Sequence, residues 1–134
     1  MFAKETHILV VDDSLNIRRL VVDNLNRLGY NKVTTAEDAN EAMKKLNASY
    51  ETENPIKLVL SDLNMPGPSG LDFLKQVRSI ANFKALPFLL VTTESEKGAV
   101  IEAATSGVSA YIVKPFNLET LTKRLGEAYK KHTA

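Results

Sequence analysis

The fold is decided by residues 56–62, which read Ile56-Lys57-Leu58-Val59-Leu60-Ser61-Asp62. This short, branched and apolar run predicts a buried β-strand, bounded by Pro55 before it and by the turn-forming residues 64–70 after it. Continuous apolar runs, without strict alternation of polar and apolar residues, are typical of strands that are covered on both faces in a parallel sheet. Asp62 therefore stands at the carboxyl end of a predicted central strand.

Similar runs occur elsewhere in the chain and alternate with helical patterns. Strands are predicted near residues 8–11, 88–91 and 111–113, with a weaker one at 33–35. The helical segments between and after them are expected from Ser14 to Gly29, over Asp38–Asn47, near Gly70–Ile80, near Glu96–Thr105, and from Asn117 onward. Five strand–helix units predict one α/β domain over residues 1–134, with a five-stranded parallel sheet and helices on both faces. The expected strand order is 2-1-3-4-5, as in flavodoxin-like folds.

Two segments are expected to lack regular structure. Residues Ala48–Asn54 are predicted to form an exposed loop before the third strand. The C-terminal residues Lys130, Lys131 and His132 are predicted to be a frayed, solvated end.

Composition excludes several classes of function. The net charge of +1 lacks the basic excess that is typical of nucleic-acid binders. No apolar stretch reaches the ~20 residues that cross a bilayer, and the first residues lack the apolar core of a secretory signal. The absence of cysteine excludes thiolate catalysis, and two histidines are too few for a histidine-based metal site. We therefore expect a cytoplasmic monomer without nucleic-acid or membrane partners.

Reactive polar residues follow four of the five predicted strands. Asp12 and Asp13 follow the first strand, Asp62 ends the third, Thr92 follows the fourth, and Lys114 follows the fifth. In an open α/β sheet, ligands bind outside the carboxyl ends of the strands where the strand order reverses, so these side chains are expected to converge. Clustered carboxylates would repel one another unless a cation such as Mg²⁺ were present, and a lysine suits a phosphate group. The pattern indicates a phosphoryl-transfer site with Asp62 as the nucleophile.

Four segments carry a resemblance to a known family: residues 9–14 (LVVDDS), 61–66 (SDLNMP), 91–94 (VTTE) and 111–116 (YIVKPF). In this order and spacing the chain resembles the receiver domain of two-component response regulators, most closely the single-domain chemotaxis regulators. The resemblance runs from about Thr6 to Lys131. One departure is Ser69, which stands where the family usually has an acidic residue.

The resemblance implies a phosphorylation site and a metal site. Asp62 would accept a phosphoryl group from a histidine kinase. Mg²⁺ would be bound by Asp13, Asp62 and the backbone carbonyl of Asn64, with Asp12 acting through a metal-bound water.

The resemblance also implies a switch. Lys114 and Thr92 would contact the phosphoryl group, Tyr111 would rotate from exposed to buried, and the peptide bond before Pro115 would be cis. The surface of the fourth helix, fifth strand and fifth helix would then bind a flagellar motor switch protein. Asn64 and Glu94 would tune the lifetime of the phosphate to seconds or minutes, with a phosphatase as a further partner.

Other interpretations remain open at this stage. Taken singly, Asp12 and Asp13 are equally well explained as helix caps, Asp62 as a turn residue and Lys114 as a solvated charge. The protein could instead be a phosphorelay shuttle or phosphate sink, or a receiver excised from a longer regulator. A hydrolase of the haloacid-dehalogenase type also uses an aspartate nucleophile, Mg²⁺ and a lysine. It is disfavoured because Asn64, two residues after Asp62, cannot act as a proton-donating acid, and external substrate turnover is not expected.

Overall fold

The computed structural model describes residues 1–92 and 102–133, which form a five-stranded parallel sheet with helices on both faces. The sheet order is β2-β1-β3-β4-β5, which confirms the predicted topology. The strands are β1 (His7–Val11), β2 (Val33–Ala36), β3 (Ile56–Asp62), β4 (Phe88–Thr92) and β5 (Ala110–Val113).

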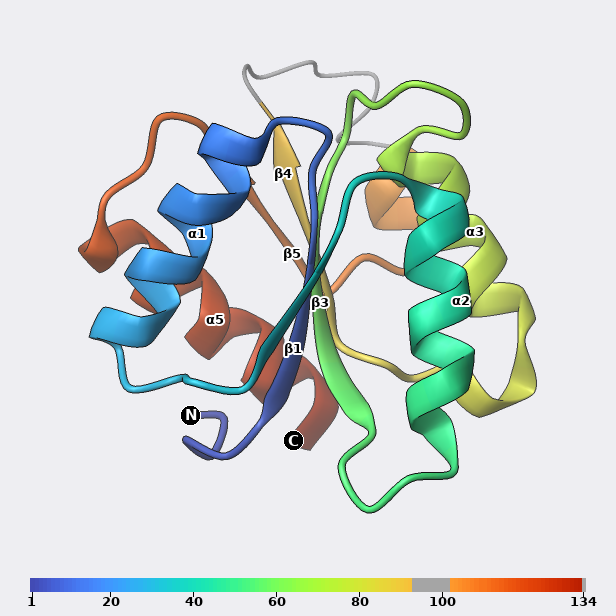
Figure 1. Cartoon of the computed structure of the whole chain (residues 1–134), viewed down its shortest axis with the longest axis horizontal. Coiled ribbons are helices and arrows are strands. Elements are labelled where there is room, and N and C mark those ends of the chain that lie inside the picture. Colours follow the sequence, from blue (N-terminus) through green and yellow to red (C-terminus); the bar gives the residue numbers. More distant parts are fainter. Residues whose placement is uncertain (93–101, 134) are drawn as a thin grey trace.

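The helices lie in two layers (Figure 1). Helices α1 (Leu15–Arg27) and α5 (Leu118–Thr133) cover one face of the sheet, and α2 (Ala39–Tyr50) and α3 (Gly70–Ser79) cover the other. A short 3₁₀ helix, η1 (Ala81–Phe83), follows α3. Residues 102–105 are helical and belong to the predicted fourth helix, whose beginning lies outside the described residues.

Side-chain alternation along the strands divides the core between these two layers. On β1, Ile8 and Val10 face the core under α1 and α5, whereas Leu9 and Val11 face the core under α2 and α3. All four are at most 2% exposed, so the strand is buried on both faces. This explains why the predicted strands read as continuous apolar runs.

The first helix begins and ends at the predicted signals. The Ser14 side chain accepts a hydrogen bond from the Ile17 amide at 3.3 Å and caps α1. Gly29 has a φ of 96°, in the left-handed region where glycine pays no steric penalty, and it ends the helical segment.

Helix α2 is longer than predicted. It continues to Tyr50, so the expected loop over Ala48–Asn54 is wrong in its first three residues. The Tyr50 ring packs edge-on against Phe83 with ring centroids 5.4 Å apart, and this contact fixes the last turn. The prediction ended the helix where its apolar face ended, at Leu46, and could not include a contact with η1.

The C-terminal end is solvated as predicted, since Lys130, Lys131 and His132 are exposed, but the predicted fraying is wrong, because α5 continues through Lys131 and His132 and is attached to the segment before β5. His132 Nε2 lies 2.6 Å from Ser109 Oγ, and Lys131 Nζ donates to the Val108 carbonyl at 3.2 Å. Ser109 Oγ also accepts a bond from the Phe88 amide.

Acidification is expected to loosen this C-terminal attachment. Burial lowers the pKa of His132 below its usual 6.5, and the charges of Arg78 and Lys131 lower it further. Because the folded-state pKa is depressed, this contribution to stability is complete above about pH 6.5 and declines as the pH falls below that value. We expect the melting temperature of His132→Gln to fall less between about pH 7.5 and about pH 5.5 than that of the parent protein. Equal slopes of melting temperature against pH would contradict this assignment.

Candidate functional site

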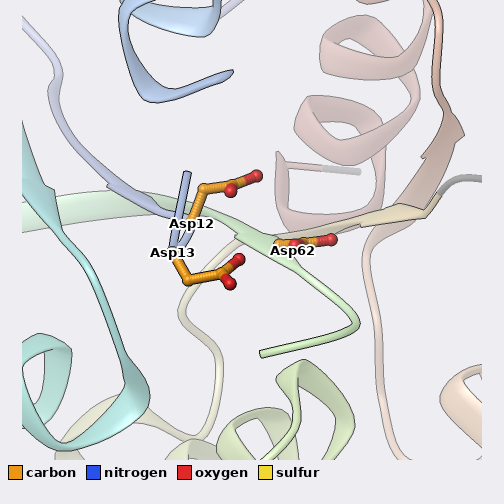
Figure 2. Close-up of side chains that lie close together, drawn as sticks. All are labelled: Asp12, Asp13 and Asp62. Atoms are coloured by element: carbon orange, nitrogen blue, oxygen red, sulfur yellow. The ribbon is translucent and has the colours of Figure 1, made fainter. Parts of the chain in front are cut away.

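Three carboxylates meet at the carboxyl ends of β1 and β3 (Figure 2). Asp12 and Asp13 follow β1, and Asp62 is the last residue of β3. The register pairs Val11 with Ser61, which brings the two strand ends side by side. One carboxylate oxygen from each of the three residues lies within 4.8 Å of the others, and all three side chains project toward the same space. The predicted convergence of these acids is therefore observed.

Lys114 joins this cluster from the end of β5. Its Nζ lies 3.1 Å from Asp12 Oδ2 and 3.3 Å from Asp62 Oδ1. All three side chains are largely buried, with at most 15% exposed. The Lys114 amide also donates to the Thr92 carbonyl, which fixes the start of the β5–α5 loop against β4. Lys114 is thus a largely buried positive charge paired with the cluster and not a solvated surface charge.

Burial is the main influence on the pKa of the Asp62 carboxyl group. It raises the pKa of Asp62 above its usual value of 3.8, and the neighbouring Asp12 charge raises it further. Lys114 and the hydrogen bond from the Asn64 amide act in the opposite direction but do not cancel these effects. The unsatisfied negative charge makes the cluster receptive to a second cation.

The predicted switch residues lie on β4 and β5. Thr92 is the last residue of β4 and is 2% exposed. Tyr111, on β5, is half-buried, and the Arg124 guanidinium of α5 lies 5.5 Å from the centre of its ring. Arg124 Nη1 also donates to both carboxylate oxygens of Glu127, at 3.1 and 3.0 Å. The Lys114–Pro115 peptide bond is cis.

The loop after Asp62 contains the remaining predicted residues that the structure describes. Asn64 is exposed at the rim of the site, while Glu94 lies outside the described residues. Ser69 caps α3, since its side chain accepts from the Asp72 amide and the Asp72 carboxylate accepts from the Ser69 amide. The serine that departs from the family pattern therefore has a local structural role.

Two residues at the site were not identified from the sequence. Arg18 donates from Nη1 to the Asp12 backbone carbonyl at 2.6 Å. Gly70 approaches the Asp62 carbonyl so closely that an added Cβ would lie 2.0 Å from that oxygen. Nothing in the residue pattern of α1 marks Arg18, whereas Gly70 could be noticed only as one of several turn residues.

The chemistry of the donors fits Mg²⁺. Asp12, Asp13 and Asp62 offer hard oxygen ligands of the kind that Mg²⁺ prefers, and Mg²⁺ commonly binds one or two carboxylates while retaining several waters. Asp13 is exposed, so a hydrated ion could reach the cluster from solvent.

Comparison with known proteins identifies the family. Residues 8–126 match the response regulator receiver domain, and the chain belongs to this family. Its members are signalling proteins and not enzymes that turn over an external substrate.

Within the family, the chain is similar to chemotaxis proteins. It is 46% identical to chemotaxis protein CheY1 of Helicobacter pylori over 118 residues, covering 88% of this chain and 92% of that protein. It is 38% identical to chemotaxis protein CheY-3 of Vibrio cholerae over 128 residues, covering 96% and 95% of the two chains. The solved structure of Vibrio cholerae chemotaxis protein CheY4 superposes with a TM-score of 0.81 at 37% identity, covering 92% of this chain and 98% of that one.

None of the helices that the structure describes combines the length and the apolar character required to cross a bilayer.

Proposed function

We propose that this protein is a single-domain response regulator that accepts a phosphoryl group on Asp62 from a histidine kinase and thereby changes its affinity for a partner. The observation that supports this most directly is the position of Asp62, buried at the end of β3 beside two other carboxylates and 3.3 Å from Lys114 Nζ. Residues 1–134 act as one receiver domain in this proposal. The similarity to chemotaxis proteins supports a role in chemotaxis, with a flagellar motor switch protein as the output partner.

The proposed reaction is an in-line transfer between two residues. A carboxylate oxygen of Asp62 attacks the phosphorus atom of the kinase phosphohistidine, and the P–N bond breaks with its electron pair returning to the imidazole. Lys114 Nζ, already held between Asp12 and Asp62, pairs with the negative phosphoryl oxygens. Asp13, Asp62 and the Asn64 carbonyl would hold Mg²⁺, with Asp12 acting through a bound water, and the ion would neutralise charge that develops on the phosphoryl group.

The proposed signal leaves the site through β4 and β5. The Thr92 hydroxyl would turn toward the phosphoryl group, and Tyr111 would rotate from its half-buried position to a buried one. Because Arg124 lies over the Tyr111 ring, this movement would alter the surface formed by the fourth helix, β5 and α5, where the partner would bind. The protein would act in the cytoplasm as a monomer, without nucleic-acid or membrane contacts.

A small-molecule phosphodonor tests the acceptor role. Incubation with phosphoramidate and Mg²⁺ is expected to add one phosphoryl group per chain, mapped to Asp62 by borohydride reduction and peptide mass spectrometry. Chelation of Mg²⁺ should slow the reaction by about a hundredfold, because the developing charge is no longer neutralised. Labelling at another residue, or labelling that is independent of Mg²⁺, would exclude the proposal.

The lifetime of the phosphate tests the roles assigned to Asn64 and Glu94. Without partners, the phosphoryl group is expected to be lost within seconds to minutes, because these polar side chains would admit or orient a hydrolytic water. Loss of labelled phosphate after removal of the donor gives this rate directly. A half-life of many hours would contradict these two roles without affecting the assignment of Asp62.

Partner binding tests the signalling role. With beryllofluoride and Mg²⁺, the affinity for the flagellar motor switch protein of the same organism is expected to rise by about tenfold. Titration calorimetry with and without beryllofluoride measures the difference, and Asp62→Asn serves as the unresponsive control. Equal affinities in both states would contradict the chemotaxis role, and rapid return of the phosphate to a histidine donor would favour a phosphorelay shuttle.

A further inference from the structure

Arg18 connects helix α1 to the backbone of the acidic cluster. Its side chain is half-buried, and Nη1 donates to the Asp12 carbonyl oxygen at 2.6 Å. Arg18 lies in the first turn of α1, where its own amide bonds to the Ser14 carbonyl at 2.9 Å. Its guanidinium group therefore reaches back over the turn between β1 and α1 and binds the chain where the acids begin.

This bond completes the attachment of Asp12. The Asp12 amide donates to the Ala36 carbonyl of β2 at 3.1 Å, and Oδ1 accepts from the Ser14 amide at 2.9 Å. Oδ2 is paired with Lys114, so the carbonyl oxygen bound by Arg18 is the fourth fixed group. Two of these four bonds come from the start of α1, through Ser14 and Arg18, and the others come from β2 and from Lys114, so together they fix the residue in position and orientation.

The carbonyl of Asp12 belongs to the peptide unit that joins Asp12 to Asp13. A peptide unit is planar, so fixing the direction of this C=O also fixes the direction of the Asp13 N–H and the start of the Asp13 side chain. Asp13 is exposed, in contrast to Asp12 at 3% and Asp62 at 6% exposure. Burial therefore does little to hold the Asp13 side chain in place, and its direction depends on the two flanking peptide units, which are held by the Arg18 bond to the Asp12 carbonyl and by the Ser14 amide bond to Asp12 Oδ1.

We propose that Arg18 is a positioning residue of the metal site, which orients the Asp12–Asp13 peptide so that the exposed Asp13 carboxylate faces Asp62. This inference rests on the proposed role of the carboxylates as Mg²⁺ ligands. In this role Arg18 would raise the affinity for Mg²⁺ by holding the backbone of Asp12 and Asp13, without contacting the ion.

Replacing Arg18 by a neutral residue has two possible effects on Mg²⁺ affinity, and they act in opposite directions. A guanidinium group near the cluster repels Mg²⁺, so loss of the charge alone would strengthen binding. Loss of the positioning bond would weaken binding, and groups that orient metal ligands typically contribute tenfold to hundredfold in affinity. We therefore expect Arg18→Gln to bind Mg²⁺ about tenfold more weakly despite having one positive charge fewer.

Calorimetric titration of the intact chain with Mg²⁺, in the absence of a phosphodonor, tests this expectation. Arg18→Lys, which keeps a charged donor, should recover most of the affinity. Arg19→Gln is the matched control, since Arg19 is the exposed next residue of α1. Within the part of the chain that the structure describes, its side chain makes no hydrogen bond or ion pair, so Mg²⁺ affinity should stay within about twofold of the parent.

The phosphorylation rate with phosphoramidate provides a second readout. The deficit of Arg18→Gln should appear at low Mg²⁺ and disappear when Mg²⁺ saturates the site, whereas general damage to the fold would lower the rate at every Mg²⁺ concentration. Affinity in Arg18→Gln that is unchanged or higher would overturn the positioning role. If the parent protein itself bound no Mg²⁺, the proposed metal site would be wrong instead.

Discussion

Asp62→Asn is expected to abolish stable phosphorylation and, in the same protein, to raise the melting temperature in Mg²⁺-free buffer. The first effect follows because an amide is not a nucleophile under these conditions, so no acyl phosphate can form. We expect phosphoryl incorporation from phosphoramidate to fall by at least about a hundredfold. The response of partner binding to beryllofluoride should be lost together with it.

The gain in stability has a separate electrostatic cause. Burial and the Asp12 charge raise the pKa of Asp62 in the folded protein, so folding favours the neutral form of this side chain. The contribution of the neutral Asp62 side chain to stability is complete below its unfolded-state pKa of 3.8, and it is lost as the pH rises through the higher folded-state pKa. Asparagine is neutral at every pH and leaves Lys114 paired with Asp12. The free energy of unfolding of Asp62→Asn should therefore be higher than that of the parent by about 1–2 kcal/mol at neutral pH.

Thermal unfolding with and without Mg²⁺ measures both parts of this prediction. Mg²⁺ should stabilise the parent protein by binding to the folded state, and it should stabilise Asp62→Asn much less. Asp23→Asn is the control, because it replaces an exposed carboxylate of α1 outside the cluster. A variant that is less stable than the parent in Mg²⁺-free buffer would show that the Lys114 pair outweighs repulsion within the cluster.

The arrangement of the site could be predicted because it depends mainly on topology. Once the apolar runs are assigned to parallel strands in the order 2-1-3-4-5, residues that follow β1, β3, β4 and β5 must lie near one edge of the sheet. Asp12, Asp62 and Lys114 confirm this expectation through direct contacts. Burial at the sheet edge then turns an ordinary turn residue into a carboxyl group with a raised pKa.

The residues that the sequence did not reveal act through contacts whose partners are distant in the chain or are backbone atoms. Arg18 binds a carbonyl six positions earlier, and His132 binds Ser109 of the loop before β5. Neither contact leaves a periodic pattern, since any exposed helical position can carry arginine or histidine. The end of α2 was mispredicted for the same reason, because it is fixed by Tyr50 packing on Phe83.

Gly70→Ala is expected to be the most destabilising of the glycine substitutions in the described part of the chain. An added Cβ would lie 2.0 Å from the Asp62 carbonyl oxygen and 2.9 Å from both the Asp62 carbonyl carbon and Leu63 Cα. These are backbone atoms, so no rotamer change can relieve the overlap. The Gly70 amide also bonds to the Leu63 carbonyl at 2.8 Å, which prevents α3 from moving away without losing that bond. We expect the free energy of unfolding of Gly70→Ala to be about 3 kcal/mol lower than that of the parent protein.

Two other glycines separate this overlap from other effects of adding a methyl group. Gly67 has a φ of 76°, and no atom of the described residues lies within 4 Å of an added Cβ, so Gly67→Ala isolates backbone strain of about 1–2 kcal/mol. Gly126 lies within α5, and its added Cβ would meet only Met1 Sδ at 3.8 Å, so alanine there should stabilise the protein by about 0.5–1 kcal/mol. Urea unfolding should therefore show a large loss in the free energy of unfolding for Gly70→Ala, a smaller loss for Gly67→Ala and a gain for Gly126→Ala.

Gly70→Ala should also slow phosphorylation, because the overlap falls on the backbone of the proposed phosphoryl acceptor, Asp62. Movement of the Asp62 carbonyl would displace both the Asp62 side chain and the following Asn64 carbonyl. Misplacement of a reacting group by about 1 Å can cost about a hundredfold in rate, and we expect a loss of that order in phosphorylation of the folded Gly70→Ala protein. Gly67→Ala, compared at a temperature where both variants remain folded, should lose much less. Equal rates in the two variants would show that the loop absorbs the methyl group without moving Asp62, and that the close approach of Gly70 serves packing alone.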